Sequence, residues 1–195
     1  MENRNFIIGI TGGSGCGKTT LLQCIAEKGG VVLDCDAIYH QLLESDPALL
    51  DAIEARFPGV VENGQLQRKK LGAIVFSDEK ALADLNTITH TAVKNAVLRA
   101  LPQKGLAAID AIALFEGDLA ELCHTTVAVT APVEDRVRRL MTRDGISEDY
   151  ARSRIAAQRT NEDFSTICDH TLENNGDIGQ FRAKCLAFLA RFGIM

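Results

Sequence analysis

The sequence predicts an α/β fold of three layers, in which a mostly parallel five-stranded sheet is flanked by helices. Apolar segments of strand length alternate with helical patterns along almost the whole chain, which is typical of this class. A glycine-rich loop also joins the first strand to the first helix, as in sheets that bind phosphate. With 195 residues, of which 46% are hydrophobic, the chain suits a single domain over residues 1–195.

The first strand, residues 6–11, leads into a loop that fits the spacing G-x-x-x-x-G-K-[ST] from Gly12 to Thr19. Its glycines let successive N–H groups converge on phosphate oxygens, and a helix that starts near Lys18 turns its positive end to the same place. Lys18 is expected to reach the outer phosphates, and the Thr19 hydroxyl to hold a Mg²⁺ ion. The sequence therefore predicts a nucleoside triphosphate site formed by Gly13, Ser14, Gly15, Cys16, Gly17, Lys18, Thr19 and Thr20.

The second strand, residues 31–33, ends in two acids separated by one residue, Asp34 and Asp36. Ligands of an open parallel sheet bind outside the carboxyl ends of the strands, so these acids are expected to share an edge with the phosphate loop. One of them could accept a proton or help to hold the metal. Asp is also a good helix N-cap, so Asp36 could instead cap the helix predicted for residues 37–43.

The next part of the chain reads as helical. A helix is predicted over residues 46–57, followed by a turn at residues 62–65. The basic run at residues 68–70 is typical of a solvated face, and Arg68 is a candidate substrate contact within it.

The longest helix is predicted to start at Ser77-Asp78, with apolar residues at helical spacing along one face. Asn86, His90 and Lys94 stand four residues apart on another face and could line a substrate cleft. His90 could equally be a surface or packing residue.

Two further apolar segments, residues 106–115 and 125–130, read as buried strands of the parallel sheet. The first runs into Glu116 and Asp118, which could contact the substrate or orient metal-bound water. The alternative is that Asp110 or Glu116 only ends the strand. A short last strand at residues 171–173 and a closing helix over residues 178–192 complete the pattern.

A helix beginning near Pro132 carries arginines at i, i+3 and i+7, which place Arg136, Arg139 and Arg143 on one face. Val137, Leu140 and Met141 occupy another face and can pack. Because Arg152, Arg154 and Arg159 continue the bias, we predict a lid over about residues 136–160 that closes on the triphosphate. Arginine suits this role because its fork pairs with two phosphate oxygens at once. The alternative is a solvated helix with ordinary salt bridges.

Composition excludes several classes of function. The net charge of −5 argues against broad binding of nucleic acid. No apolar run approaches the roughly 20 residues of a membrane helix, and the first residues lack a signal-peptide pattern, so we expect a cytoplasmic protein. The six cysteines form no C-x-x-C pair and are expected to be free thiols.

Taken together, these motifs resemble those of the dephospho-CoA kinase family over nearly the whole chain. Residues 9–20 are similar to its opening G-[LI]-T-G-G-x-G-x-G-K-[ST]-T, and residues 34–36 stand where it has D-A-D. The remaining matches are residues 85–90 with L-x-x-I-x-H, residues 139–144 with R-x-x-x-R-[DN], residues 154–158 with R-I-x-x-Q, and Asp169 with residues 174–176 for D-x-x-[IL]-x-N-x-G.

This resemblance implies a P-loop kinase fold with a helical lid and an acceptor-binding helical region at about residues 58–101. It implies ATP and Mg²⁺ as cofactors, and phosphorylation of the ribose 3′-hydroxyl of dephospho-CoA by a monomer or weak oligomer. Asp36 matches the acid that serves as general base. The other roles implied are Lys18, Arg139 and Arg143 in catalysis, Asn175 near the adenine, Thr19 on the metal, and Asp34, Asp36, His90, Glu116 and Arg68 on the substrate.

The acceptor-side motifs depart from the family's usual pattern. Thr91 replaces the proline that follows the histidine, residues 112–116 read I-A-L-F-E in place of P-L-L-[FV]-E, and residues 62–68 also differ. A kinase for another small nucleotide or hydroxyl substrate is therefore one alternative, and a nucleotide-binding regulatory ATPase is a second. The chain lacks the N-K-x-D motif with which a GTPase switch reads guanine.

Overall fold

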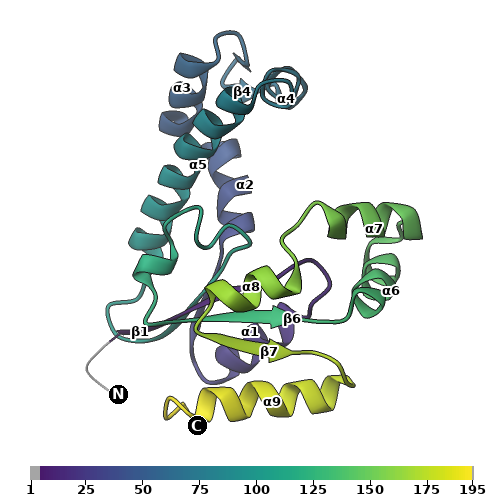
Figure 1. The fold of residues 1–195 in the computed structure, drawn as a ribbon. Coiled ribbons are helices and arrows are strands. Elements are labelled where there is room, and N and C mark those ends of the chain that lie inside the picture. The colour runs from purple at the N-terminus through teal and green to yellow at the C-terminus, as the bar shows by residue number, and fades with distance from the viewer. Residues whose placement is uncertain (1–4, 195) are drawn as a thin grey trace. The chain divides into compact units, whose positions relative to one another are not determined.

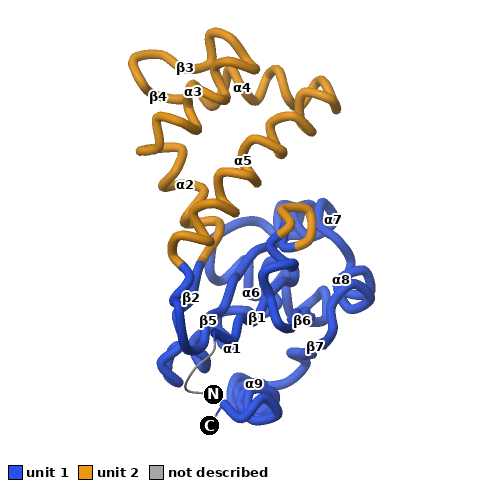
Figure 2. The backbone as a smooth tube through the Cα atoms, turned by 90° about the vertical axis from the view of Figure 1, so that its left-hand side faces the viewer, with its two compact units in different colours: residues 1–33, 101–114, 119–195 blue, residues 34–100, 115–118 orange. Residues whose placement is uncertain are grey.

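The computed structural model describes residues 5–194 (Figure 1). Residues 1–4, in which the sequence has no signal-peptide pattern, lie outside the described residues. The chain divides into two compact units, shown in different colours in Figure 2. Unit 1 comprises residues 1–33, 101–114 and 119–195, and unit 2 comprises residues 34–100 and 115–118.

Unit 1 contains a five-stranded sheet, as the sequence predicted, and the structure shows that its strand order is β2-β5-β1-β6-β7. The strands are β1 (Asn5–Thr11), β2 (Val31–Asp34), β5 (Gly105–Asp110), β6 (Thr125–Thr130) and β7 (His170–Glu173). The helices are α1 (Lys18–Glu27), the 3₁₀ helix η1 (Ala120–Leu122), α6 (Val133–Asp144), α7 (Glu148–Ala156), α8 (Asn161–Ile167) and α9 (Ile178–Ala190). Because β1 pairs in parallel with both β5 and β6, the loop after β1 leaves the sheet at its centre.

The core of unit 1 packs β1 and β6 against α1 and α9. Ile8 and Ile10 alternate with residues of the opposite face of β1, and both are fully buried among side chains of the two helices. Figure 1 shows α9 below the sheet, while α8 packs against β6 above it. The sheet therefore has helices on both sides, which is the predicted three-layer arrangement.

Unit 2 is mainly helical and has its own hydrophobic core. It consists of α2 (Cys35–Ser45), α3 (Pro47–Arg56), α4 (Arg68–Val75), α5 (Glu79–Ala100) and the antiparallel hairpin of β3 (Val61–Glu62) and β4 (Gln65–Leu66). The Glu54 carboxylate accepts hydrogen bonds from the N–H groups of Gly59 (2.6 Å) and Val61 (2.7 Å), which hold the start of the hairpin and lower the Glu54 pKa. The region predicted to bind the acceptor falls almost entirely in this unit.

The strand predicted for residues 106–115 is wrong in extent, because β5 ends at Asp110. After Ala111 donates to the carbonyl oxygen of Ile10 (3.1 Å), the chain leaves the sheet. It then turns so that Leu114 is fully buried, and the Leu114 carbonyl oxygen accepts two later N–H groups at 3.0 Å. The apolar run continues past Asp110 because a turn, rather than a strand, is packed into the core.

All six cysteines are free thiols, as predicted. Within residues 5–194, no group of three or more acidic, histidine or cysteine side chains could hold a metal ion. A helix long and apolar enough to cross a membrane is likewise absent from the described part of the chain.

Candidate active site

The phosphate loop is held by side chains from the second half of the chain. Three successive carbonyl oxygens of the loop each accept a hydrogen bond from one of these side chains. The pairs are Arg136 Nε with Ser14 O (3.0 Å), Arg139 NH1 with Gly15 O (3.0 Å) and Asn174 Nδ2 with Cys16 O (2.9 Å). All of these residues belong to unit 1. The carbonyl groups are thus satisfied within the protein, as buried backbone acceptors need to be.

We call these three hydrogen bonds the clamps of the loop. Two of them, from Arg136 and Asn174, require a nearby glycine in the loop. A Cβ atom on Gly13 would lie 2.1 Å from NH2 of Arg136, and one on Gly17 would lie 2.3 Å from Nδ2 of Asn174. Gly17 also has a φ of 98°, which other residues rarely adopt. The absence of a side chain at Gly13 and Gly17 therefore lets the loop pack closely against Arg136 and Asn174. At Gly17 it also permits the positive φ.

Lys18 and Thr19 start α1, as the motif requires. The Lys18 ammonium donates to the carbonyl oxygen of Gly12 at 2.8 Å, so it folds back along the loop. Thr19 is exposed, and its hydroxyl forms no hydrogen bond to any residue that the structure describes. Cys16 is buried within the loop. Burial raises the pKa of its thiol, although Arg136 and Lys18 act in the opposite direction.

Arg136, Arg139 and Arg143 of α6 do not form one exposed face, and this part of the lid prediction is wrong. Arg136 is only 2% exposed and lies behind the loop, whereas Met141, expected to pack, is 38% exposed. The cause is that the loop packs against the first two turns of α6 and covers Arg136. Arg143, near the end of the helix, instead forms two hydrogen bonds to Asp144, at 2.6 and 3.0 Å.

Asp144 also binds Arg154, through a 2.8 Å hydrogen bond. The hydrogen bond from Arg143, with that from Arg154, lowers the pKa of the Asp144 carboxyl to about 2. Two of the arginines in the predicted lid therefore share a single carboxylate.

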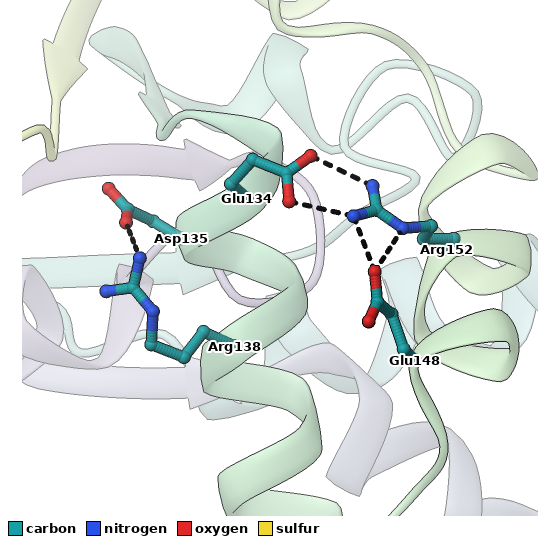
Figure 3. Close-up of polar contacts among 5 residues, drawn as sticks. All are labelled: Glu134, Asp135, Arg138, Glu148 and Arg152. Atoms are coloured by element: carbon teal, nitrogen blue, oxygen red, sulfur yellow. Dashed lines mark hydrogen bonds and ion pairs between the residues drawn. The ribbon is translucent and has the colours of Figure 1, made fainter.

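Helices α6 and α7 pack as a pair through buried Val137, Leu140, Ala151 and Ile155. On their exposed side Arg152 bridges Glu134 (2.8 Å) and Glu148 (2.7 Å), as Figure 3 shows. For Arg152, the alternative of ordinary surface salt bridges is thus correct. Because exposed ion pairs contribute little to stability, the buried apolar contact is the main interaction that holds the two helices together.

The two acids after β2 have different surroundings. Asp34 is the N-cap of α2, and its carboxylate accepts a 3.0 Å hydrogen bond from the N–H of Ala37. The alternative that Asp36 is the cap is therefore wrong, because α2 begins two residues earlier than expected. Asp36 is exposed in the first turn of α2, and its carboxylate has no hydrogen bond or ion pair among residues 5–194.

Unit 2 contains a cavity of about 550 Å³ beside α5. The predicted stripe of Asn86, His90 and Lys94 lines it, together with Glu116 and Asp118. His90 Nδ1 lies 3.1 Å from the carbonyl oxygen of Glu116, which fixes the ring relative to the segment 115–118. The structure thus brings together two of the five predicted substrate-binding residues, His90 and Glu116.

Arg68 is not among the residues that line this cavity. It is exposed at the start of α4, close enough to Tyr39 to oppose the increase in the Tyr39 pKa that burial causes.

Asn175, expected near the adenine, is exposed. Its side chain binds Glu173 (3.0 Å) and Lys184 (2.8 Å). Its neighbour Asn174 is the residue that contacts the loop.

From the sequence alone, neither Asn174 nor Gln158 is named as a site residue, and Arg136 is assigned to the lid instead of to the support of the loop. Gln158 Oε1 accepts from the N–H of Ser14 at 2.9 Å, and its Nε2 donates to the Ser14 hydroxyl at 2.8 Å. The motifs R-I-x-x-Q and N-x-G contain Gln158 and Asn174 and were the available signals, but a motif does not tell which part of the molecule a side chain contacts.

The chain is similar to known proteins over nearly its whole length. A family model described as dephospho-CoA kinase matches residues 6–180. The chain is 31% identical to a dephospho-CoA kinase of Latilactobacillus sakei over 185 residues, covering 92% of both chains. It is 34% identical to one of Carboxydothermus hydrogenoformans, covering 95% of this chain and 94% of the relative. A crystal structure from Thermus thermophilus superposes with a TM-score of 0.79 at 33% identity, covering 96% of this chain and 98% of that one.

Proposed function

This chain belongs to the dephospho-CoA kinase family, phosphotransferases of coenzyme A biosynthesis, and we propose how its residues share the reaction. Unit 1 binds ATP through the phosphate loop, and unit 2 binds dephospho-CoA. The γ-phosphoryl group passes to the ribose 3′-hydroxyl of the acceptor, which gives coenzyme A and ADP. Membership of the family favours this reaction over the two alternatives that the sequence left open.

The observation that carries the proposal is the clamped phosphate loop. Three of its carbonyl oxygens are bound by Arg136, Arg139 and Asn174, which fixes the backbone of the loop. The N–H groups of Ser14 and Cys16 are bound within the protein, so the other N–H groups of the loop are the candidates for the phosphate oxygens of ATP. Lys18 exchanges its bond to the loop for one to the outer phosphates. The charge that develops during transfer is then stabilised by fixed dipoles.

The Thr19 hydroxyl, exposed at the start of α1, would hold Mg²⁺. This residue fits the ion because its hydroxyl oxygen is a hard ligand that the protein leaves unused. When bound, Mg²⁺ neutralises phosphate charge.

Asp36 is proposed as the general base for the acceptor hydroxyl. Its exposed carboxylate is used neither as a helix cap nor in an ion pair with any described residue, so it can accept a proton. Asp34 caps α2 and thereby positions Asp36 in the first turn. Arg139 and Arg143 assist transfer by binding phosphoryl oxygens, for which Arg143 has to leave Asp144.

The cavity beside α5 is proposed to hold part of the acceptor. Asn86, His90 and Lys94 offer donors to an anionic nucleotide from one wall. The exposed Arg68 and the Glu116 carboxylate are further candidate contacts. A cytoplasmic location and a monomer or weak oligomer remain predictions.

The test measures ADP release from ATP and Mg²⁺, with and without dephospho-CoA, together with coenzyme A formation. Dephospho-CoA should stimulate ADP release and be converted to coenzyme A. Asp36→Asn should lower this turnover by about 10²- to 10⁴-fold while ATP still binds. Asp51→Asn, an equal change of charge at an exposed position on α3, is the matched control and should be active. ATP binding without stimulation by dephospho-CoA would contradict the acceptor assignment.

A further inference from the structure

Arg136 is a buried cation without a protein counter-charge. Its side chain is 2% exposed, and no carboxylate among residues 5–194 lies within ion-pairing distance of it. Its guanidinium donates instead to two neutral acceptors, the Ser14 carbonyl oxygen (3.0 Å) and the Gln158 side-chain oxygen (3.0 Å). Burying a charge in this way costs free energy unless an opposite charge is supplied.

The charge lies against the phosphate loop. A Cβ atom on Gly13 would lie 2.1 Å from NH2 of Arg136. The guanidinium group therefore packs directly against the backbone of the loop at Gly13, where a larger residue would clash with it. The same cation, with Lys18, favours the thiolate of Cys16 against the effect of burial. Its electrostatic influence therefore extends along the loop that binds phosphate.

Gln158 forms hydrogen bonds both with Arg136 and with Ser14 of the phosphate loop. Its side-chain oxygen accepts from Arg136 and from the N–H of Ser14, and its NH₂ group donates to the Ser14 hydroxyl. Its own backbone is fixed to the end of α7 by a hydrogen bond to Ile155 (3.1 Å). A glutamate could accept the first two hydrogen bonds equally well, and the Ser14 hydroxyl could then turn to donate. The residue present differs from glutamate in being neutral.

We propose that Gln158 is a positioning residue that orients Arg136 without neutralising it, so that the phosphates of bound ATP supply the missing counter-charge. The proposal rests on the proposed function, because it requires ATP in the phosphate loop. It predicts that a negative charge at position 158 affects stability and nucleotide binding in opposite directions. A purely structural role would make the two effects run in parallel.

The experiment measures the dissociation constant for ATP with Mg²⁺ and the melting temperature of the nucleotide-free protein. Gln158→Glu should raise the dissociation constant roughly tenfold or more, because the new carboxylate both neutralises Arg136 and repels phosphate. Its melting temperature should equal or exceed that of the unmodified protein. Gln158→Ala should lower the melting temperature and raise the dissociation constant less than Gln158→Glu does. Gln103→Glu, the same change at an exposed position before β5, should alter neither quantity.

Two results would overturn the inference: an ATP affinity of Gln158→Glu within twofold of the unmodified protein, or a greater loss of affinity in Gln158→Ala than in Gln158→Glu. The second result would mean that Gln158 acts only by packing and hydrogen bonding. If the unmodified protein itself does not bind ATP, the proposed function falls, and this inference falls with it.

Discussion

The side-chain amide of Asn174 donates to the carbonyl oxygen of Cys16 at 2.9 Å, across a separation of 158 residues. Asn174 is 6% exposed, and its own N–H donates to the carbonyl oxygen of Thr130 at 2.8 Å. The residue thus ties the turn after β7 both to the end of β6 and to the phosphate loop. Three separate segments therefore meet at one residue, through its backbone N–H and its side-chain amide.

We expect Asn174→Ala to destabilise the protein by about 1–3 kcal/mol, because it leaves the Cys16 carbonyl oxygen without its donor. Asn175→Ala is the matched control, since Asn175 is exposed and should change stability by less than about 0.5 kcal/mol. Urea unfolding of both variants checks the expectation. Equal losses of stability would contradict it.

The same pair of variants also tests the adenine contact implied by the family resemblance. ATP affinity should fall in Asn174→Ala because the loop loses a support. A loss of affinity in Asn175→Ala, with its stability unchanged, is the result expected if Asn175 contacts the adenine.

For the acceptor side, we expect His90→Ala to raise the KM for dephospho-CoA by about tenfold, the effect of losing one hydrogen bond to a charged ligand. The KM for ATP should not change, because His90 lines the cavity of unit 2 and not the phosphate loop. His40→Ala, at an exposed position on α2, is the control. An increased KM for ATP alone would contradict the assignment of the cavity.

Asp144 makes the stability of the folded protein depend on pH. Its hydrogen bonds to Arg143 and Arg154 lower its pKa from 3.8 to about 2 in the folded protein. A carboxyl group with a lowered pKa stabilises the folded state above its unfolded pKa, and this contribution disappears as the pH falls through its folded pKa. Asp144→Asn should therefore lower the urea midpoint above about pH 4, and the difference should shrink between about pH 4 and pH 2. A difference independent of pH would contradict this account.

The phosphate loop and the sheet could be predicted because they depend on local patterns. Glycine spacing, a preceding apolar strand and a following helix are all read within residues 6–27. The end of β5 could not be predicted in this way, because a buried turn at Leu114 is as apolar as a buried strand. Hydrophobicity reports burial, and it does not distinguish the backbone conformations that achieve it.

The supports of the loop depend on tertiary contacts. Spacing correctly put Arg136 and Arg139 on neighbouring turns of one helix, and both reach the loop. It could not tell that the loop covers the first of them, nor that the Arg143 side chain forms hydrogen bonds with the adjacent Asp144 carboxylate. The sequence also did not show that Asp34, and not Asp36, caps α2. The predicted helix started at residue 37, whereas α2 begins at Cys35.

The clamps on the phosphate loop have a consequence for the order in which the protein becomes functional during translation. The loop is made early, whereas its supports at Arg136, Arg139, Gln158 and Asn174 are made much later. At about 5–20 residues per second, the ribosome needs on the order of ten seconds to pass from the loop to Asn174. A nascent chain therefore carries an incomplete nucleotide site for most of its synthesis, and ATP can assist folding only at the end.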